Sequence, residues 1–331
     1  MSAPPTLGGV YLRSYLAPFA DLLEQPDVTD ILVNRPGELW VERQGRGMER
    51  VEAPLLTGQT LARLAQQIAS LAHQGLSREH PLLSASLPDG ARVQVVVPPA
   101  TRGEIAMAIR RHVVSDLTLD DYATDGAFEG VTSARVDGPS PEYQALKDLL
   151  DAGDMVAFFR AAVLARKTIV LSGGTSSGKT TLLNALLKEI PRGERLITIE
   201  DAAEVRLEHP NALGLIAARG LAGEAQVTAE DLLQACLRLR PDRILLGELR
   251  GREAFSFLRA VNTGHPGSIT TVHADSPRGA LDQISLMTLQ AGLNIGWSEV
   301  GAYVRQAVDI VVQLGRRDGK RRISEVLLNQ R

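Results

Sequence analysis

One segment of the chain constrains its fold more than any other, because it matches the pattern G-x-x-x-x-G-K-[ST] in full. Its residues are Gly173, Gly174, Thr175, Ser176, Ser177, Gly178, Lys179 and Thr180. The segment follows an apolar, strand-like run at 168–171 and precedes a helical pattern that begins at Lys179. A strand, a glycine-rich turn and a helix in this order form a cradle for phosphate oxygens. The sequence therefore predicts a nucleoside triphosphate site, with ATP and Mg²⁺ as its ligands.

Each residue type in this segment has a separate task. Glycines let backbone N–H groups approach phosphate oxygens without a Cβ in the way, and the helix N-terminus adds a positive dipole. Lys179 is expected to reach the β- and γ-phosphates, and the Thr180 hydroxyl is expected to ligate Mg²⁺. Thr181 closes the predicted binding segment.

Acidic residues follow two further predicted strands. Glu200 and Asp201 come after the strand-like run 196–199, and Glu248 comes after the run 244–247. Ligands of open α/β sheets bind at the carboxyl ends of strands, so these acids are candidates for holding metal and orienting water. Two alternatives stay open: an ordinary ion pair of Glu248 with Arg250, and a simple turn at Glu200. Asp242 begins its strand and is interpreted as a structural cap.

Histidines and arginines surround the same region. His273 ends the predicted strand 268–272, near the expected γ-phosphate, and it lacks the spacing of a zinc pair with His265. Arginine can stabilise charge on a transferring phosphoryl group, also from a neighbouring subunit. The residues alone do not distinguish this role from a balanced basic face for the cluster Arg238, Arg240, Arg243, Arg250 and Arg252.

The order of elements predicts two domains. Predicted strands at 28–34, 38–43, 92–97 and 104–110, together with a helix at 58–74, indicate a small α+β domain over 1–123. Residues 142–331 alternate buried strands with helices, which is typical of α/β proteins with a parallel sheet. Residues 124–141 are rich in Gly, Ser, Asp and Pro, so they are interpreted as a linker. A late hairpin is predicted around a basic turn at 316–322. A solvated hairpin tip is favoured there over contact with nucleic acid or lipid.

Composition narrows the function classes. The net charge of −3 gives no general attraction to nucleic acid. The single cysteine, Cys236, excludes an internal disulfide or a four-cysteine zinc site. The first residues lack the pattern of a signal peptide, and no apolar run is long enough to span a bilayer, so a cytoplasmic protein is expected. Contact with a membrane through a partner remains compatible with this expectation.

Five ordered motifs together carry a family resemblance. They are Gly173–Thr181, 199–201, 237–243, 246–250, and the segment 263–274. In this order they resemble the Walker A, acidic, Walker B and histidine boxes of the secretion ATPase superfamily, which drives type II and type IV secretion and type IV pili. The N-terminal segments 28–34 and 89–92 are most similar to the hexameric traffic ATPases of type IV secretion and conjugation.

The resemblance implies roles for particular residues. Glu248 would polarise the attacking water, Glu200 would act near the metal or water, and His273 would contact the γ-phosphate. Arg238 and Arg250 would act across a subunit boundary, and the N-terminal arginines Arg92 and Arg110 would cover the nucleotide. Two positions depart from the family pattern: Ser176 replaces a usual glycine, and Ala202-Ala203 replace a usual threonine.

The resemblance also implies a RecA-like P-loop domain, a hexameric ring and inner-membrane secretion-channel components as partners. Three alternatives remain at this point. One is a pilus or type II secretion motor of the same superfamily. Another is a nucleic-acid-dependent helicase, which the charge and the scarcity of aromatic residues disfavour. The third is a small-molecule kinase.

Overall fold

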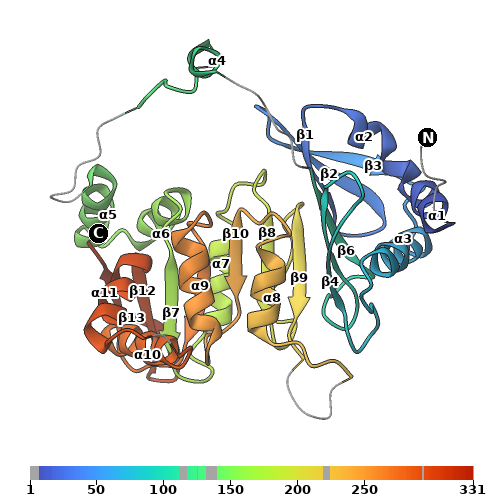
Figure 1. The fold of residues 1–331 in the computed structure, drawn as a ribbon. Coiled ribbons are helices and arrows are strands. Elements are labelled where there is room, and N and C mark those ends of the chain that lie inside the picture. The colour runs from blue at the N-terminus through green and yellow to red at the C-terminus, as the bar shows by residue number, and fades with distance from the viewer. Residues whose placement is uncertain are drawn as a thin grey trace.

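The computed structural model describes residues 7–111, 118–124, 126–131, 140–218, 224–292 and 294–330. Two sheets organise these residues, one on each side of the predicted linker (Figure 1). The first residues of the chain, on which the signal-peptide prediction rests, and much of the linker 124–141 lie outside the described residues. Every helix in the described ranges is too short or too polar to cross a membrane.

The N-terminal unit is built on six antiparallel strands in the order β3-β2-β1-β6-β5-β4. Its strands are β1 Val28–Val33, β2 Gly37–Arg43, β3 Met48–Ala53, β4 Leu82–Ser86, β5 Arg92–Val96 and β6 Ala106–Arg110. Its helices are α1 Leu7–Leu16, the short η1 Ala17–Phe19, α2 Ala20–Glu24 and α3 Gly58–Leu71. The α+β expectation is confirmed, although β3 and β4 were not among the predicted strands.

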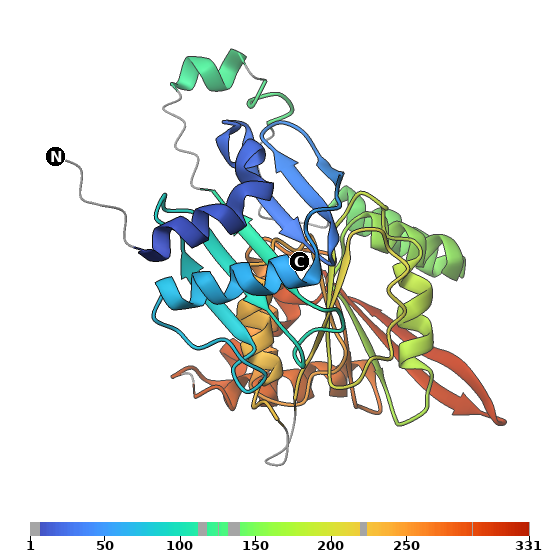
Figure 2. The ribbon, with the colours of Figure 1, turned by 90° about the vertical axis from the view of Figure 1, so that its right-hand side faces the viewer.

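Helix α3 shows why the sequence folds in this way. The Thr57 side chain accepts a hydrogen bond from the Thr60 N–H at 3.1 Å, which caps the first turn. An apolar stripe then buries Leu61, Leu64 and Ile68 against the sheet. Figure 2 shows α1 and α3 lying across the face of the N-terminal sheet that is turned toward the viewer. One face of this sheet is therefore covered from within its own unit.

The opposite face of the N-terminal sheet packs on the second unit. Leu32 and Trp40 of this face share one buried cluster with Leu213 and Leu215 of the second sheet. Burial of such apolar surface is the main favourable contribution to docking two units. The contact places the N-terminal sheet beside the outer strand of the second sheet (Figure 1).

The second sheet has seven strands in the order β13-β12-β7-β11-β10-β8-β9. All neighbouring pairs are parallel except the terminal hairpin of β12 and β13. The strands are β7 Ile169–Gly173, β8 Leu196–Glu200, β9 Ala212–Ile216, β10 Arg243–Leu246, β11 Ile269–Val272, β12 Ile310–Arg317 and β13 Lys320–Leu328. The expected parallel-rich sheet and the late hairpin are confirmed, whereas β9 was not predicted.

Helices cover both faces of this sheet, as its uniformly apolar strands require. One buried cluster contains residues of α5 Pro141–Asp151, α6 Met155–Leu164 and α7 Lys179–Leu187. The other contains residues of α8 Ala229–Cys236, α9 Glu253–Asn262, α10 Pro277–Leu289 and α11 Trp297–Ala307. Helix α4, Leu119–Thr124, lies between the two units along the chain (Figure 1). Cys236 is fully buried, as expected for a small apolar residue, and burial raises the pKa of its thiol.

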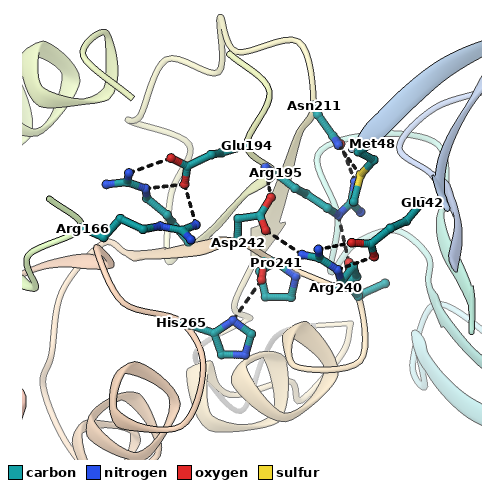
Figure 3. Close-up of polar contacts among 12 residues, drawn as sticks. Glu42, Met48, Arg166, Glu194, Arg195, Asn211, Arg240, Pro241, Asp242 and His265 are labelled. Atoms are coloured by element: carbon teal, nitrogen blue, oxygen red, sulfur yellow. Dashed lines mark hydrogen bonds and ion pairs between the residues drawn. The ribbon is translucent and has the colours of Figure 1, made fainter. Parts of the chain in front are cut away.

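A fully buried arginine joins the two units (Figure 3). Arg195 Nη1 donates to Asn34 Oδ1 at 2.7 Å and to Asn211 Oδ1 at 2.6 Å, and its Nε donates to the Leu239 carbonyl at 2.9 Å. Burial lowers the pKa of Arg195 to about 10. This pKa is still well above neutral pH, so the guanidinium stays charged there. Asn34 comes from the N-terminal unit, so Arg195 forms buried hydrogen bonds with both units in this arrangement.

Replacing Arg195 with methionine is expected to destabilise the protein by about 3 kcal/mol, because the oxygens of Asn34 and Leu239 lose the donor that Arg195 supplies and Asn211 Oδ1 keeps only the Asn34 amide as a donor. Urea unfolding followed by circular dichroism would measure this loss. Arg160→Met is the matched control, since Arg160 pairs with Glu189 at the surface, and it is expected to unfold at the wild-type midpoint. Equal midpoints for the two variants would contradict a structural role for Arg195.

Candidate nucleotide site

Four adjacent strands bring the candidate motifs to one edge of the second sheet. In the sheet order β7-β11-β10-β8, their carboxyl ends carry the phosphate-binding loop, His273, Glu248 and Glu200. These strands are mutually parallel, so all four ends lie on the same side. The crossover order places His273 between the loop and Glu248, which the linear sequence does not show.

The loop from Gly173 to Lys179 has a backbone that requires glycine at two positions. A Cβ at Gly173 would lie 2.5 Å from the Leu314 carbonyl oxygen, and Gly178 has φ +104° at the N-terminus of α7. Ser176 also adopts a left-handed backbone, with φ +59°, so the position where the family usually has glycine keeps a conformation that favours glycine. The predicted strand–loop–helix context of the motif is confirmed.

Lys179 lies folded back over this loop. Its Nζ donates to the carbonyls of Gly173 at 2.6 Å and Gly174 at 3.2 Å, and lies 3.4 Å from His273 Nδ1. Burial lowers the pKa of Lys179, and the charge of Glu248 opposes this shift. The ammonium is thus held at the mouth of a loop lined with backbone donors, where phosphate would bind.

Glu248 interacts with two side chains at the end of β10. Its Oε1 lies 3.1 Å from His273 Nε2, and its Oε2 accepts a hydrogen bond from Arg250 Nη2 at 2.5 Å. Arg250 also donates to Asp201 Oδ2 at 2.9 Å. The hydrogen bond from Arg250 to Glu248 is the main cause of the raised pKa of Arg250. The ion pair that the sequence left as an alternative for Glu248 is present, and it lies inside the candidate site.

Glu200 organises the turn after β8. Its Oε1 accepts hydrogen bonds from the N–H groups of Glu204 at 3.0 Å and Val205 at 2.8 Å, and its Oε2 forms an ion pair with Arg102. Glu204 in turn accepts a hydrogen bond from Thr180 Oγ1 at 3.0 Å. The acidic turn therefore contacts the hydroxyl that was predicted to ligate Mg²⁺.

These groups surround a cavity of about 340 Å³. Its lining includes residues Thr175, Ser176, Lys179, Thr180, Glu200, Asp201, Glu204, Glu248, Arg250 and His273. Carboxylates, hydroxyls and an ammonium line the polar part of the cavity, and Leu183, Ile199 and Leu246 line an apolar part. The ammonium and the loop N–H groups attract phosphate oxygens, and the carboxylates suit a cation bound beside them.

The other candidate residues lie elsewhere. Thr181 lines a neighbouring cavity, and Arg321 of the basic hairpin donates to its hydroxyl at 3.4 Å. Arg92 and Arg110 are exposed and lie opposite each other on β5 and β6. They are not among the residues that line the cavity of their own chain. Their contact with nucleotide stays a prediction.

The arginine cluster that the sequence suggested around the Glu248 strand is divided between the two edges of the sheet. Arg238 lies before β10, at the edge opposite Glu248, and donates to Ser84 Oγ of the N-terminal unit at 2.7 Å. Arg240 pairs with Glu42 and Asp242 (Figure 3). The fully buried Arg243 pairs with Glu194. Arg252 is exposed before α9.

Asp242 has the capping role expected of it, because it accepts the Arg195 N–H at 2.6 Å. Arginines before β10 meet acids at one edge of the sheet, and Arg250, which follows β10, meets acids at the other edge. Within one chain, Arg250 is the member of the predicted cluster that lines the cavity.

Sequence reasoning missed two residues of this site. Glu204 follows Glu200 by four positions, and its place in the acidic run was the available signal. Arg102 belongs to the distant loop between β5 and β6, and no local pattern distinguishes it from other surface arginines. Its contact with Glu200 depends on how the two units dock.

The donors present fit a hard divalent cation. Mg²⁺ prefers oxygen ligands and is commonly bound through one or two protein groups together with substrate phosphates. Thr180 Oγ1 and the carboxylate of Glu204 already meet at 3.0 Å beside the loop. Among the described residues, no group of three or more His, Cys, Asp or Glu side chains is arranged to hold a metal. A site shared with nucleotide phosphates matches this donor set.

A parallel-rich sheet with a phosphate-binding loop after β7, an acid after β10 and an apposed N-terminal unit defines the class of RecA-like P-loop ATPases. Residues 141–325, more than half of the chain, match the model of the type II/IV secretion system protein family. The chain belongs to this family. The resemblance inferred from the five motifs is thereby confirmed.

Individual relatives point to the type IV branch. The type IV secretion system protein VirB11 of Brucella suis is 41% identical over 321 residues, which cover 94% of this chain and 88% of that protein. The PtlH homolog of Bordetella bronchiseptica is 42% identical over 313 residues, which cover 92% and 91% of the two chains. The crystal structure of the Brucella suis VirB11 ATPase in complex with sulphate aligns with a TM-score of 0.89 at 39% identity, covering 97% of this chain and 95% of that one.

Proposed function

We propose that this protein hydrolyses ATP in a Mg²⁺-dependent reaction and uses the energy to power type IV secretion. One observation carries the proposal: four neighbouring strand ends place Lys179, His273, Glu248 and Glu200 around a single cavity beside the phosphate-binding loop. The membership in the secretion family and the VirB11 relatives support the coupling to secretion.

Each residue around the cavity has a proposed role in ATP binding or hydrolysis. The loop N–H groups and Lys179 would bind the β- and γ-phosphates. Glu248 would accept the proton of the attacking water, and His273, which contacts both Lys179 and Glu248, would orient these groups toward the γ-phosphate. Thr180 and Glu200 would hold Mg²⁺ or the water it orders, with Glu204 beside them. When bound, Mg²⁺ would neutralise charge that develops on the transferring phosphoryl group.

Two arginines are proposed to act between subunits. Arg238 is exposed at the sheet edge opposite the cavity, and Arg250 is exposed at the cavity mouth. A residue at the opposite edge can reach a nucleotide only in a neighbouring copy, which requires head-to-tail contacts, and such contacts form a ring when the rotation between copies closes. We propose a hexamer at the cytoplasmic face of the inner membrane, in contact with secretion-channel components.

The N-terminal unit, residues 1–123, is proposed to move relative to residues 142–331 through the linker 124–141 during the ATP cycle. Arg92 and Arg110 would then cover the nucleotide of whichever site their unit approaches. The exposed position of both side chains supports this role. Hinge motion about a linker is a common way to convert ligand binding into work.

The purified protein is expected to release phosphate from ATP without any added acceptor, and to lose this activity when EDTA replaces Mg²⁺. A coupled phosphate assay measures both the release and its loss.

The protein is expected to assemble into a particle with six times the mass of one chain. Light scattering with and without nucleotide would measure this mass. Strong stimulation by single-stranded DNA would favour the helicase alternative. An active, strictly monomeric enzyme would refute the ring and the intersubunit arginines.

A further inference from the structure

The loop between β5 and β6 of the N-terminal unit extends the second sheet at its edge. The Ile216 N–H donates to the Ala100 carbonyl at 2.9 Å, and the Arg102 N–H donates to the Gly214 carbonyl at 2.9 Å. Thr101 and Leu215 form an antiparallel bridge between these two bonds. The loop thus pairs with β9 by its main chain, which fixes its position against the sheet that carries the nucleotide site.

A glycine in β9 makes room for the side chain that leaves this loop. A Cβ at Gly214 would lie 2.5 Å from Cδ and 2.8 Å from Nε of Arg102. Glycine is unfavourable in the interior of a strand and often marks close approach of another group. Here the approaching group is the Arg102 side chain, which crosses β9 at this point.

Arg102 ends in the candidate site. Its Nη1 donates to the Val205 carbonyl at 2.8 Å, and its Nη2 pairs with Glu200 Oε2. The other oxygen of Glu200 accepts the N–H groups of Glu204 and Val205, and Glu204 contacts the Thr180 hydroxyl at 3.0 Å. A continuous set of polar contacts therefore connects the N-terminal sheet with the residue expected to ligate Mg²⁺.

Other arginines cross between the units without reaching this site. Arg78 pairs with Glu224 at the surface, and Arg240 pairs with Glu42. Neither Glu224 nor Glu42 lines the cavity, whereas Glu200 does. This difference provides a comparison within the same interface between the two units.

We propose that Arg102 is a positioning residue that couples the place of the N-terminal unit to the nucleotide site, by occupying Glu200 Oε2 through the opening at Gly214. The proposal rests on the proposed function, because it takes the cavity to be the Mg²⁺–nucleotide site. Glu200 Oε1 already accepts two backbone N–H groups. A Mg²⁺ ion or a water molecule that binds Glu200 Oε2 must therefore share this oxygen with the Arg102 guanidinium. Binding at the site and docking of the loop then influence each other.

The first experiment compares nucleotide affinity with and without Mg²⁺. Binding of a fluorescent ADP analogue is measured in Mg²⁺ and in EDTA for the wild type, Arg102→Ala and Arg78→Ala. Loss of one charge-assisted hydrogen bond changes an equilibrium about tenfold. Arg102→Ala is expected to raise the ratio of the EDTA to the Mg²⁺ dissociation constants about tenfold, because Glu200 Oε2 loses its competitor. Arg78→Ala is expected to keep the wild-type ratio.

Two further variants separate positioning from loss of folding or charge. Gly214→Ala keeps the arginine at position 102, but the added Cβ would occupy the space through which the Arg102 side chain reaches Glu200. This variant is therefore expected to raise the ratio of the EDTA to the Mg²⁺ dissociation constants as Arg102→Ala does. Arg102→Lys keeps the charge but cannot reach Glu200 and Val205 together, so an intermediate ratio is expected. Thermal unfolding of each variant establishes that it is folded.

Hydrogen exchange of the peptide covering residues 97–106 gives a readout independent of turnover. Addition of Mg²⁺ and a non-hydrolysable ATP analogue is expected to change exchange of this peptide in the wild type and in Arg78→Ala, and to leave it unchanged in Arg102→Ala. If the wild type binds no nucleotide, the proposed function fails, and this proposal fails with it. If the wild type binds nucleotide but Arg102→Ala matches Arg78→Ala in both measurements, the coupling through Arg102 is refuted and the proposed function still stands.

Discussion

Lys179→Ala is expected to lower nucleotide affinity and ATP turnover by about 100-fold or more, the scale of loss when one preorganised hydrogen-bond donor is removed from an active site. Lys179 is half-buried, and its ammonium lies over the loop at hydrogen-bond distance from two loop carbonyls. Alanine removes the positive charge that the β- and γ-phosphates would meet, and leaves the loop backbone in place. Calorimetry and a phosphate-release assay measure the two losses.

Lys188→Ala is the matched control for this prediction, because Lys188 caps the other end of the same helix and is exposed. It is expected to bind and hydrolyse ATP as the wild type does. Unchanged affinity in Lys179→Ala would show that the triphosphate is bound elsewhere. Equal losses in both variants would point to damage to α7 rather than to the site.

Glu248→Gln is expected to separate binding from hydrolysis. The amide keeps the size of the side chain and can still accept a hydrogen bond from Arg250, but it cannot take a proton from water. Loss of a general base lowers the rate by roughly 100- to 10,000-fold. Affinity for ATP is expected to stay within about threefold of the wild type, because the amide preserves the shape of the site. Single-turnover hydrolysis measures the chemical step directly.

Glu189→Gln provides the control for a lost surface carboxylate, since Glu189 pairs with Arg160 away from the cavity. Full activity is expected of it. If Glu248→Gln hydrolysed ATP normally while Glu200→Gln did not, the base would be Glu200 at the neighbouring strand end. The assignment of Glu248 to the attacking water would then be wrong.

Local sequence predicted most of the secondary structure of the second unit. The loop at 173–180 and the apolar runs before Glu200 and Glu248 carry strong short-range signals, because buried parallel strands are uniformly apolar. The strands β3, β4 and β9 were missed. Strand β3, for example, is an edge strand in which three of the six residues are charged and none is buried. Such strands form because a neighbour supplies hydrogen bonds, which the local sequence does not show.

The candidate site was predictable to the extent that its residues end strands. Glu200, Glu248 and His273 all follow strand-like runs, and the structure gathers them around one cavity. The arginines were not predictable in this way. Arg243 looked equivalent to Arg250 in the sequence, yet it begins β10 and is buried in an ion pair with Glu194. Long side chains reach several partners, so tertiary position decides their role.

The phosphate-binding loop was determined by the sequence itself, because glycine, lysine and threonine at fixed spacing act through backbone geometry within one short segment. The tertiary structure alone decided what completes the site. The crossover order placed His273 between Lys179 and Glu248, and docking of the N-terminal sheet on β9 brought Arg102 to Glu200. These contacts join residues 25 to 98 positions apart, so they depend on strand order and on packing between units, and no local pattern encodes them.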